Sequence, residues 1–209
     1  MHPFLSRLRV KPEVQKFFKP HYTLDKLGNL VFPYGDLLEH FGFAFHRVPV
    51  SEYLWIAGNT NYSQVRQVII CSSAMEAISW LNKNYYSFPN TDNLLFLATG
   101  AGVQTGHISW IKAHLHRKNF CMVFGSDLLG RIADLKMATG IRSWPVEIYH
   151  ENHKITVSFR SWTFLFDHEK FSLNAFEKAA GYRFHIPAHK PKGFDSFFDE
   201  LKANAGFTL

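Results

Sequence analysis

The sequence predicts an α/β fold whose core is a parallel sheet with helices on both faces. Three short apolar runs lead to this prediction: Val68–Cys71, Leu94–Leu97 and Cys121–Phe124. Each run is followed by a turn of small or polar residues and then by an amphipathic helical pattern. Because near-continuous apolar strands that alternate with helices are typical of buried parallel strands, we expect all three in one sheet.

A small mixed α/β module is expected over residues 1–65, before this core. Proline at the first helical position predicts a helix from Pro12 to about Phe18. The Gly28-Asn29 pair predicts the turn of a hairpin within residues 25–33. Two further short strands are expected at Gly42–Arg47 and Tyr53–Ala57.

The core is expected over residues 66–145. Ser73 followed by Glu76 has the spacing of a capping box, so a helix should begin directly after the first strand. Helices are also expected at about 105–116 and 127–138, after the second and third strands.

The alternation of apolar strands and helices stops at about residue 146. Over residues 146–209 the sequence predicts an extension of a β-hairpin plus a helix, which forms one compact unit with the rest. Alternating runs at Val146–Tyr149 and Ile155–Arg160 predict the hairpin, and Trp162–Phe166 extends it. Ser172 then caps a helix near Leu173–Ala180 that stops at Gly181.

Composition narrows the class of protein. With 209 residues, 46% hydrophobic and 16% aromatic, the chain can bury a sizeable core and is too apolar for long disorder. No apolar stretch approaches the roughly 20 residues that span a bilayer, and residues 1–7 lack the apolar centre of a signal peptide. Both cysteines fall inside predicted strands, which argues against disulfides and zinc. We therefore expect a cytoplasmic protein with no membrane partner.

The first and third strands end in turns that resemble a known active site. Ser72-Ser73 follows the first strand, and Gly125-Ser126-Asp127 with Gly130-Arg131 follows the third. This pattern resembles the primase-related Toprim family, especially the Toprim-like proteins of plasmids and conjugative or mobilisable elements. In that family the corresponding strands end in Glu-Gly and Asp-x-Asp, and the carboxylates hold a divalent metal.

The resemblance covers roughly residues 66–140 and implies a Toprim-like sheet with a degenerate active site. The positions equivalent to the family's catalytic residues are Ser72, Ser73, Glu76, Gly125 and Asp127. Serines stand where Glu-Gly is expected and glycine replaces the first Asp, so no residue is assigned as catalytic. We expect Cys71–Ser72 and Phe124–Gly125 to end neighbouring parallel strands.

Asp127 and Glu76 are the candidate metal ligands that remain. Magnesium prefers carboxylate oxygens and stabilises charge in phosphoryl transfer, so two acids in one cleft could still hold it with a substrate. Each acid also has a structural interpretation: Glu76 completes the capping box, and Asp127 lies at a helix N-terminus with Arg131 four residues later. We expect no cofactor, or magnesium if the site is active.

The net charge of +6 is unevenly placed. Residues 1–21 hold five Lys or Arg and one acid, and no acid lies between Asp92 and Asp127. Basic clusters neutralise phosphates, although a solvated basic face has the same composition. The candidate nucleic-acid-binding residues are Arg7, Arg9, Lys11, Lys16, Lys19, Lys112, Arg117, Lys118 and Arg131.

The leading hypothesis is therefore a catalytically degenerate Toprim-like protein that acts in DNA binding, replication or mobilisation of a mobile element. Its partner would be single- or double-stranded DNA or a DNA-processing complex. One alternative is an active metal-dependent enzyme, primase-like or nuclease-like, that uses Asp127 and Glu76. The other is a protein-interaction module whose exposed aromatic side chains bind another protein.

Overall fold

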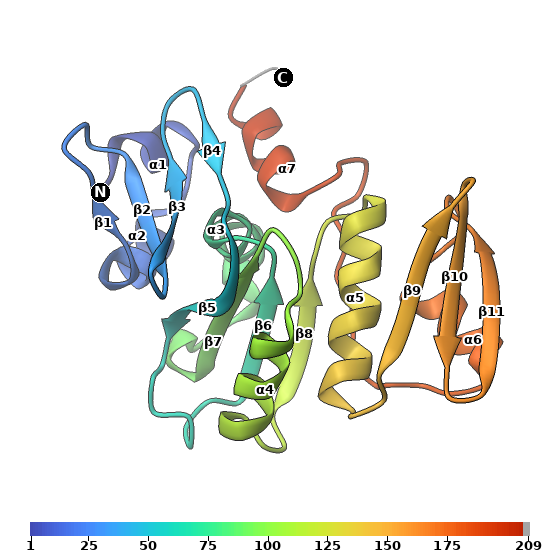
Figure 1. Ribbon diagram of the computed structural model, residues 1–209. Coiled ribbons are helices and arrows are strands. Elements are labelled where there is room, and N and C mark those ends of the chain that lie inside the picture. Colours follow the sequence, from blue (N-terminus) through green and yellow to red (C-terminus); the bar gives the residue numbers. More distant parts are fainter. Residues whose placement is uncertain (207–209) are drawn as a thin grey trace.

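The computed structural model describes residues 1–206, which form a mixed α/β structure with three sheets in a row (Figure 1). A small N-terminal sheet lies at one end, the central sheet lies in the middle, and a three-stranded sheet lies at the other end. Within these residues no helix has the length and apolar character needed to cross a bilayer.

The N-terminal part combines short helices with a four-stranded antiparallel sheet. Its elements are α1 (Pro3–Arg7), α2 (Pro12–Phe18), a 3-10 turn (Lys19–His21), β1 (Thr23–Leu24), β2 (Leu30–Tyr34), β3 (Leu37–Phe41) and β4 (His46–Arg47). The predicted helix and hairpin are confirmed, with Leu24 paired to Leu30. The strand expected at 42–47 is wrong over most of its length. The Gly42 N–H donates to the Phe45 carbonyl, which makes this segment the turn between β3 and β4.

The central sheet has the strand order β5-β7-β6-β8. Its strands are β5 (Val50–Gly58), β6 (Gln67–Cys71), β7 (Leu94–Gly100) and β8 (Asn119–Val123). The three strands predicted as parallel, β6, β7 and β8, are parallel. Cys71 pairs with both Ala98 and Val123, so β6 and β8 are neighbours that end together, as expected. The strand β5 runs antiparallel beside β7 and was expected in the N-terminal module instead.

Helices cover both faces of the central sheet because successive strand residues point to opposite faces. Ile69, Phe96 and Val123 pack on the side of α2, α3 (Ala74–Asn84) and α7 (Phe197–Asn204). Val68, Leu95 and Met122 pack on the side of α4 (Thr105–His114) and α5 (Leu128–Ile141). Two 3-10 turns, Tyr85–Ser87 and Thr91–Asn93, connect α3 to β7.

The C-terminal part is an antiparallel meander covered by one helix. It contains β9 (Val146–Glu151), β10 (Lys154–Phe159), β11 (Trp162–Asp167) and α6 (Leu173–Ala180), so the predicted hairpin and its third strand are confirmed. Ile155, Val157 and Phe159 face the core beside α5 and α6.

The chain then returns to the central sheet. The Met122 N–H donates to the Pro187 carbonyl (2.9 Å), and the His189 N–H donates to the Met122 carbonyl (2.8 Å). This short segment lies parallel to the outer edge of β8 and leads into α7, which packs on α3 (Figure 1).

Candidate functional site

The carboxyl ends of the three parallel strands open on one cleft of about 320 Å³. Ser72 lines it after β6, Thr99 and Gly100 line it at the end of β7, and Gly125 lines it after β8. The start of α5 and three residues near the start of α7, Asp195, Ser196 and Asp199, complete the wall. Open α/β sheets bind their ligands at this edge, so the predicted turns do converge where a site would lie.

Asp127 lines this cleft, and its carboxylate caps the N-terminus of its own helix, α5. As the N-cap of α5, its Oδ1 accepts a hydrogen bond from the Gly130 N–H at 2.8 Å. The carboxylate thereby satisfies a backbone donor that the helix leaves without an intrahelical partner.

Glu76 is buried and is not among the residues that line the cleft. Its Oε2 and Oε1 accept hydrogen bonds from the Phe197 and Phe198 N–H groups, at 3.1 and 2.9 Å, at the start of α7. Burial raises the pKa of this carboxyl group. Only half of the predicted capping box forms: Ser73 Oγ accepts from the Glu76 N–H, but the Glu76 side chain points to α7. The two candidate metal ligands are therefore in different environments.

Glu39 is a second buried carboxylate, which the sequence analysis missed. It accepts hydrogen bonds from the Tyr34 hydroxyl (2.6 Å), His46 Nε2 (2.8 Å) and the Ala74 N–H (2.9 Å), with a longer one from the Met75 N–H. It thus lies at the N-terminus of α3, directly behind the Ser72-Ser73 turn. A helix N-terminus is a ready anion site, and here a carboxylate of the same chain occupies it.

Lys190 brings a positive charge to the carboxyl end of β8. Its Nζ donates to the Gly125 carbonyl (2.7 Å) and the Phe124 carbonyl (3.1 Å), and pairs with Asp134 Oδ2 (2.6 Å). Asp134 is almost fully buried on α5, and its Oδ1 has no hydrogen-bond partner among the described residues. Burial raises the pKa of Asp134 to about 6, against the opposing effect of Lys190.

Two further acids, Asp195 and Asp199, line the cleft. Asp199 contacts the Ser196 hydroxyl and Lys202 Nζ, both at 2.7 Å. Within residues 1–206 no group of three or more His, Cys, Asp or Glu side chains gathers in a metal-binding arrangement. Asp127 and Asp199 thus have partners inside the protein, whereas the Asp195 carboxylate has no bonded partner among the described residues.

Four of the nine candidate basic residues bond to backbone carbonyls of the chain itself. Arg9 bonds to Asn204, Lys11 to Asn82, Lys118 to Val65, and Arg131 to Glu169 and Phe171. The guanidinium of a fifth, Arg7, lies 4.8 Å from the centre of the Phe43 ring. Arg131 does not pair with the Asp127 carboxylate; its Nε donates to the Asp127 carbonyl.

The other four, Lys16, Lys19, Lys112 and Arg117, are exposed. None has an ion pair or a side-chain hydrogen bond within residues 1–206. The helices α2 and α4 cover opposite faces of the central sheet, so these residues form two separate basic surfaces.

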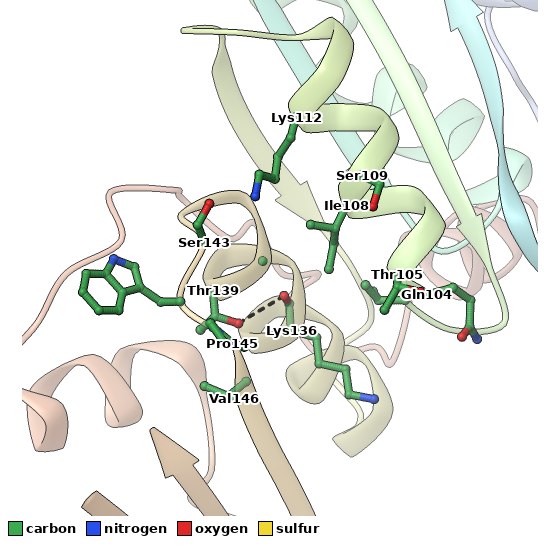
Figure 2. Close-up of a pocket in the computed structure, with 13 residues that line it drawn as sticks. Gln104, Thr105, Ile108, Ser109, Lys112, Lys136, Thr139, Ser143, Pro145 and Val146 are labelled. Atoms are coloured by element: carbon green, nitrogen blue, oxygen red, sulfur yellow. Dashed lines mark hydrogen bonds between the residues drawn. The ribbon is translucent and has the colours of Figure 1, made fainter. Parts of the chain in front are cut away.

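A larger concavity, the α4–α5 groove, lies on the α4 side (Figure 2). It has a volume of about 560 Å³. Gln104, Thr105, Ile108, Ser109 and Lys112 line it from α4 and the turn before it. Lys136, Thr139, Gly140, Ser143 and the following Trp144–Val146 line it from α5 and beyond. No acidic residue is among the described residues of its lining.

Sequence reasoning missed Lys136, although it found Lys112. Both lysines are exposed and lack an acidic partner in the described part of the chain. Lys136 occupies a single polar position on a predicted helix, which gives no signal by itself. Only the approach of α5 to α4 makes it part of a basic groove.

The groove is held by close helix contacts. A Cβ on Gly140 would meet the Ile108 side chain, so α4 and α5 approach closely at this position. The Arg160 guanidinium lies 3.7 Å from the centre of the Trp144 ring and fixes that side chain.

Comparison of the chain with protein-family models, with curated proteins and with solved structures found no match in any of the three.

Proposed function

We propose that this protein is a Toprim-like DNA-binding protein without metal-dependent catalysis, which acts in replication or mobilisation of a mobile element. The observation that carries the proposal is the contrast in pairing: the carboxylates expected at the metal site are bonded within the chain, whereas the lysines of the α4–α5 groove have no acidic partner.

The state of the acids supports the loss of metal chemistry. Glu76 uses both oxygens on α7, and Asp127 caps α5. Lys190 places an ammonium group against the Gly125 carbonyl, beside the position where the resemblance would put a metal ligand. The Lys190 ammonium group would repel a magnesium ion bound beside this carbonyl, so magnesium binding is disfavoured there.

The basic groove supports nucleic-acid binding. Lys112 on α4 and Lys136 on α5 line the groove, and Arg117 follows α4 in the sequence. Phosphate groups would supply the counter-charge that the described residues do not. The free thiols of Cys71 and Cys121 fit a reducing compartment, so we place the protein in the cytoplasm.

The test is a DNA-binding titration with the whole protein, followed by fluorescence anisotropy at several salt concentrations. We expect the logarithm of the affinity to fall linearly with the logarithm of the salt concentration, because each phosphate contact releases counterions. Lys112→Ala with Arg117→Ala should weaken binding severalfold. Lys26→Ala with Lys178→Ala, at exposed lysines outside both basic surfaces, is the matched control.

Magnesium separates this proposal from an enzyme. DNA cleavage or primer synthesis that requires magnesium and disappears in Asp127→Ala, with the fold intact, would contradict the loss of catalysis. Failure to bind any DNA at low salt would contradict the DNA-binding role, and a protein partner would become the better hypothesis.

A further inference from the structure

We propose that the α4–α5 groove binds an unpaired nucleotide, so that the protein prefers single-stranded nucleic acid to a duplex. This inference rests on the proposed DNA-binding function and assigns that function a place and a form of substrate.

The groove has the size and wall chemistry of a small-molecule site. Its volume of about 560 Å³ is within the range of roughly 300–1,000 Å³ that is typical of ligand pockets. Ile108, Val146 and Pro145 provide the apolar surface. A flat, partly apolar base can cover such a surface, whereas a phosphate alone would leave it exposed to water.

The two lysines of the groove are placed to contact a nucleic-acid strand and not a single anion. Lys112 extends from α4 toward the Ser143 end of the groove, and Lys136 extends from α5 in a different direction (Figure 2). Two ammonium groups that diverge from one apolar surface suit two phosphates on either side of a base. No carboxylate lines the groove to repel them.

Ser143 adds a hydroxyl group at a position that favours glycine. It is the C′ residue of α5: its N–H donates to the Gly140 carbonyl and the Trp144 N–H donates to the Thr139 carbonyl, which is the Schellman pattern. Its φ of 59° is in the left-handed region, where serine is strained. The Ser143 and Ser109 hydroxyls are both available to a ligand, since neither has a hydrogen-bond partner among the described residues.

A duplex cannot use the groove in this way. Its bases are paired and stacked, so it offers this surface only phosphates. The apolar wall of the groove then stays exposed to water and contributes nothing to the affinity. In a single strand the base can leave the stack and lie against aromatic or apolar side chains while the backbone contacts lysines. The preference for single strands follows from the apolar wall, and the salt dependence follows from the lysines.

The experiment compares three probes by fluorescence anisotropy: a labelled single-stranded oligonucleotide, its blunt duplex, and the same strand with abasic sites. We expect the intact single strand to bind at least fivefold more tightly than either of the others. A strand of RNA with the same sequence identifies which nucleic acid supplies the nucleotide, and the same preference in either strand supports the inference.

A matched pair of variants tests the location. Ser109→Phe fills the groove from the exposed side of α4, and we expect it to reduce single-strand affinity to the level of the abasic probe. Ala113→Phe places the same side chain on the same helix outside the groove and should leave affinity within twofold. Lys136→Ala should reduce the salt slope for the single strand by about 0.7, while Lys26→Ala, at an exposed lysine in the turn between β1 and β2, should not.

The outcomes separate the inference from the function on which it rests. The groove assignment is overturned if the three probes bind with equal affinity. It is also overturned if Ser109→Phe and Lys136→Ala both bind as the wild type does. Either result leaves the proposed DNA binding intact. No binding of any probe at low salt overturns both. Circular dichroism of each variant confirms that the fold is intact.

Discussion

The cleft at the end of the parallel strands and the α4–α5 groove differ in how their polar groups are paired. In and around the cleft, the Asp127 and Glu76 carboxylates bond to N–H groups at helix N-termini. The Lys190 ammonium group bonds to the Gly125 carbonyl. In the groove, Lys112 and Lys136 have no acidic partner among the described residues. Both are concave, and the groove is the larger of the two.

The cleft has the topological position where α/β sheets bind ligands, yet Asp127 and Glu76 already bond to helix N-termini. The groove lies between two helices, and its lysines have no acidic partner among the described residues. Removal of a cleft carboxylate should therefore change the free energy of unfolding, and removal of a groove lysine should change binding.

Glu39→Ala should give the largest effect on stability. The substitution leaves the Tyr34 hydroxyl and the Ala74 N–H buried without their acceptor, and we expect a loss of about 3–5 kcal/mol in the free energy of unfolding. Urea denaturation measures it. Glu13→Ala, at an exposed acid on α2, is the control and should change stability by no more than about 0.5 kcal/mol. A loss below about 1 kcal/mol for Glu39→Ala would mean that this carboxylate does not hold α3 in place.

The pH dependence of Asp134 should be nearly as large. Burial raises its folded-state pKa to about 6 from an ordinary value of 3.8, so the folded state binds the proton more tightly than the unfolded state does. Its contribution to stability is fully present below about pH 4 and is lost as the pH rises through about 6.

Relative to Asp134→Asn, the free energy of unfolding of the wild type should therefore fall by about 3 kcal/mol between pH 3 and pH 7. Chemical denaturation of both proteins across this range measures the difference. If the two curves stay parallel, Asp134 titrates at its ordinary value and Lys190 compensates its burial in full.

Glu76→Gln should cost about 2 kcal/mol, because one N–H group at the start of α7 would meet an amide NH₂ in place of an oxygen. The readouts are urea denaturation and the rate of tryptic cleavage at Lys202, which should rise when α7 detaches more often. Glu200→Gln on the same helix loses only the surface pair with Lys83 and should cost less than about 1 kcal/mol. Equal effects of the two substitutions would remove the distinction between buried and surface carboxylates.

Ser143→Gly should give the smallest effect, of opposite sign. Glycine adopts a φ near 59° without strain, so we expect stability to rise by up to about 1 kcal/mol. Ser109→Gly, inside helix α4, should instead lower stability by about 0.5 kcal/mol. Thermal unfolding of the pair checks both signs, and a destabilising Ser143→Gly would show that the serine hydroxyl already stabilises the fold.

The local parts of the fold were predictable from the sequence. Three runs are apolar throughout, since both faces of their strands are buried: Val68–Cys71, Leu94–Leu97 and Cys121–Phe124. Each lies within a parallel strand, except that β8 ends one residue before Phe124. The Ser73 cap was predictable for a similar reason, because its bond to the Glu76 N–H lies within four consecutive residues.

Contacts between distant segments were not predictable in this way. The edge strand β5 has the same local pattern whether it pairs within the N-terminal module or with β7. Glu39 lies in the run Leu37–Phe41, where the leucines are exposed and the acid is buried, against the usual preference of each residue type. Lys190 and Lys136 are ordinary polar positions until β8 or α4 lies beside them.

The partnership of Glu76 with α7 has a consequence for how the chain folds during its synthesis. The carboxylate and its donors are 121 and 122 residues apart. A ribosome that adds about 5–20 residues per second needs roughly 6–24 s to cover that interval. During this time α3 has been synthesised, but the Phe197 and Phe198 N–H groups that bond to its buried Glu76 carboxylate have not. The α3 face of the sheet must then remain open to water or to a chaperone, so the core on this side closes late.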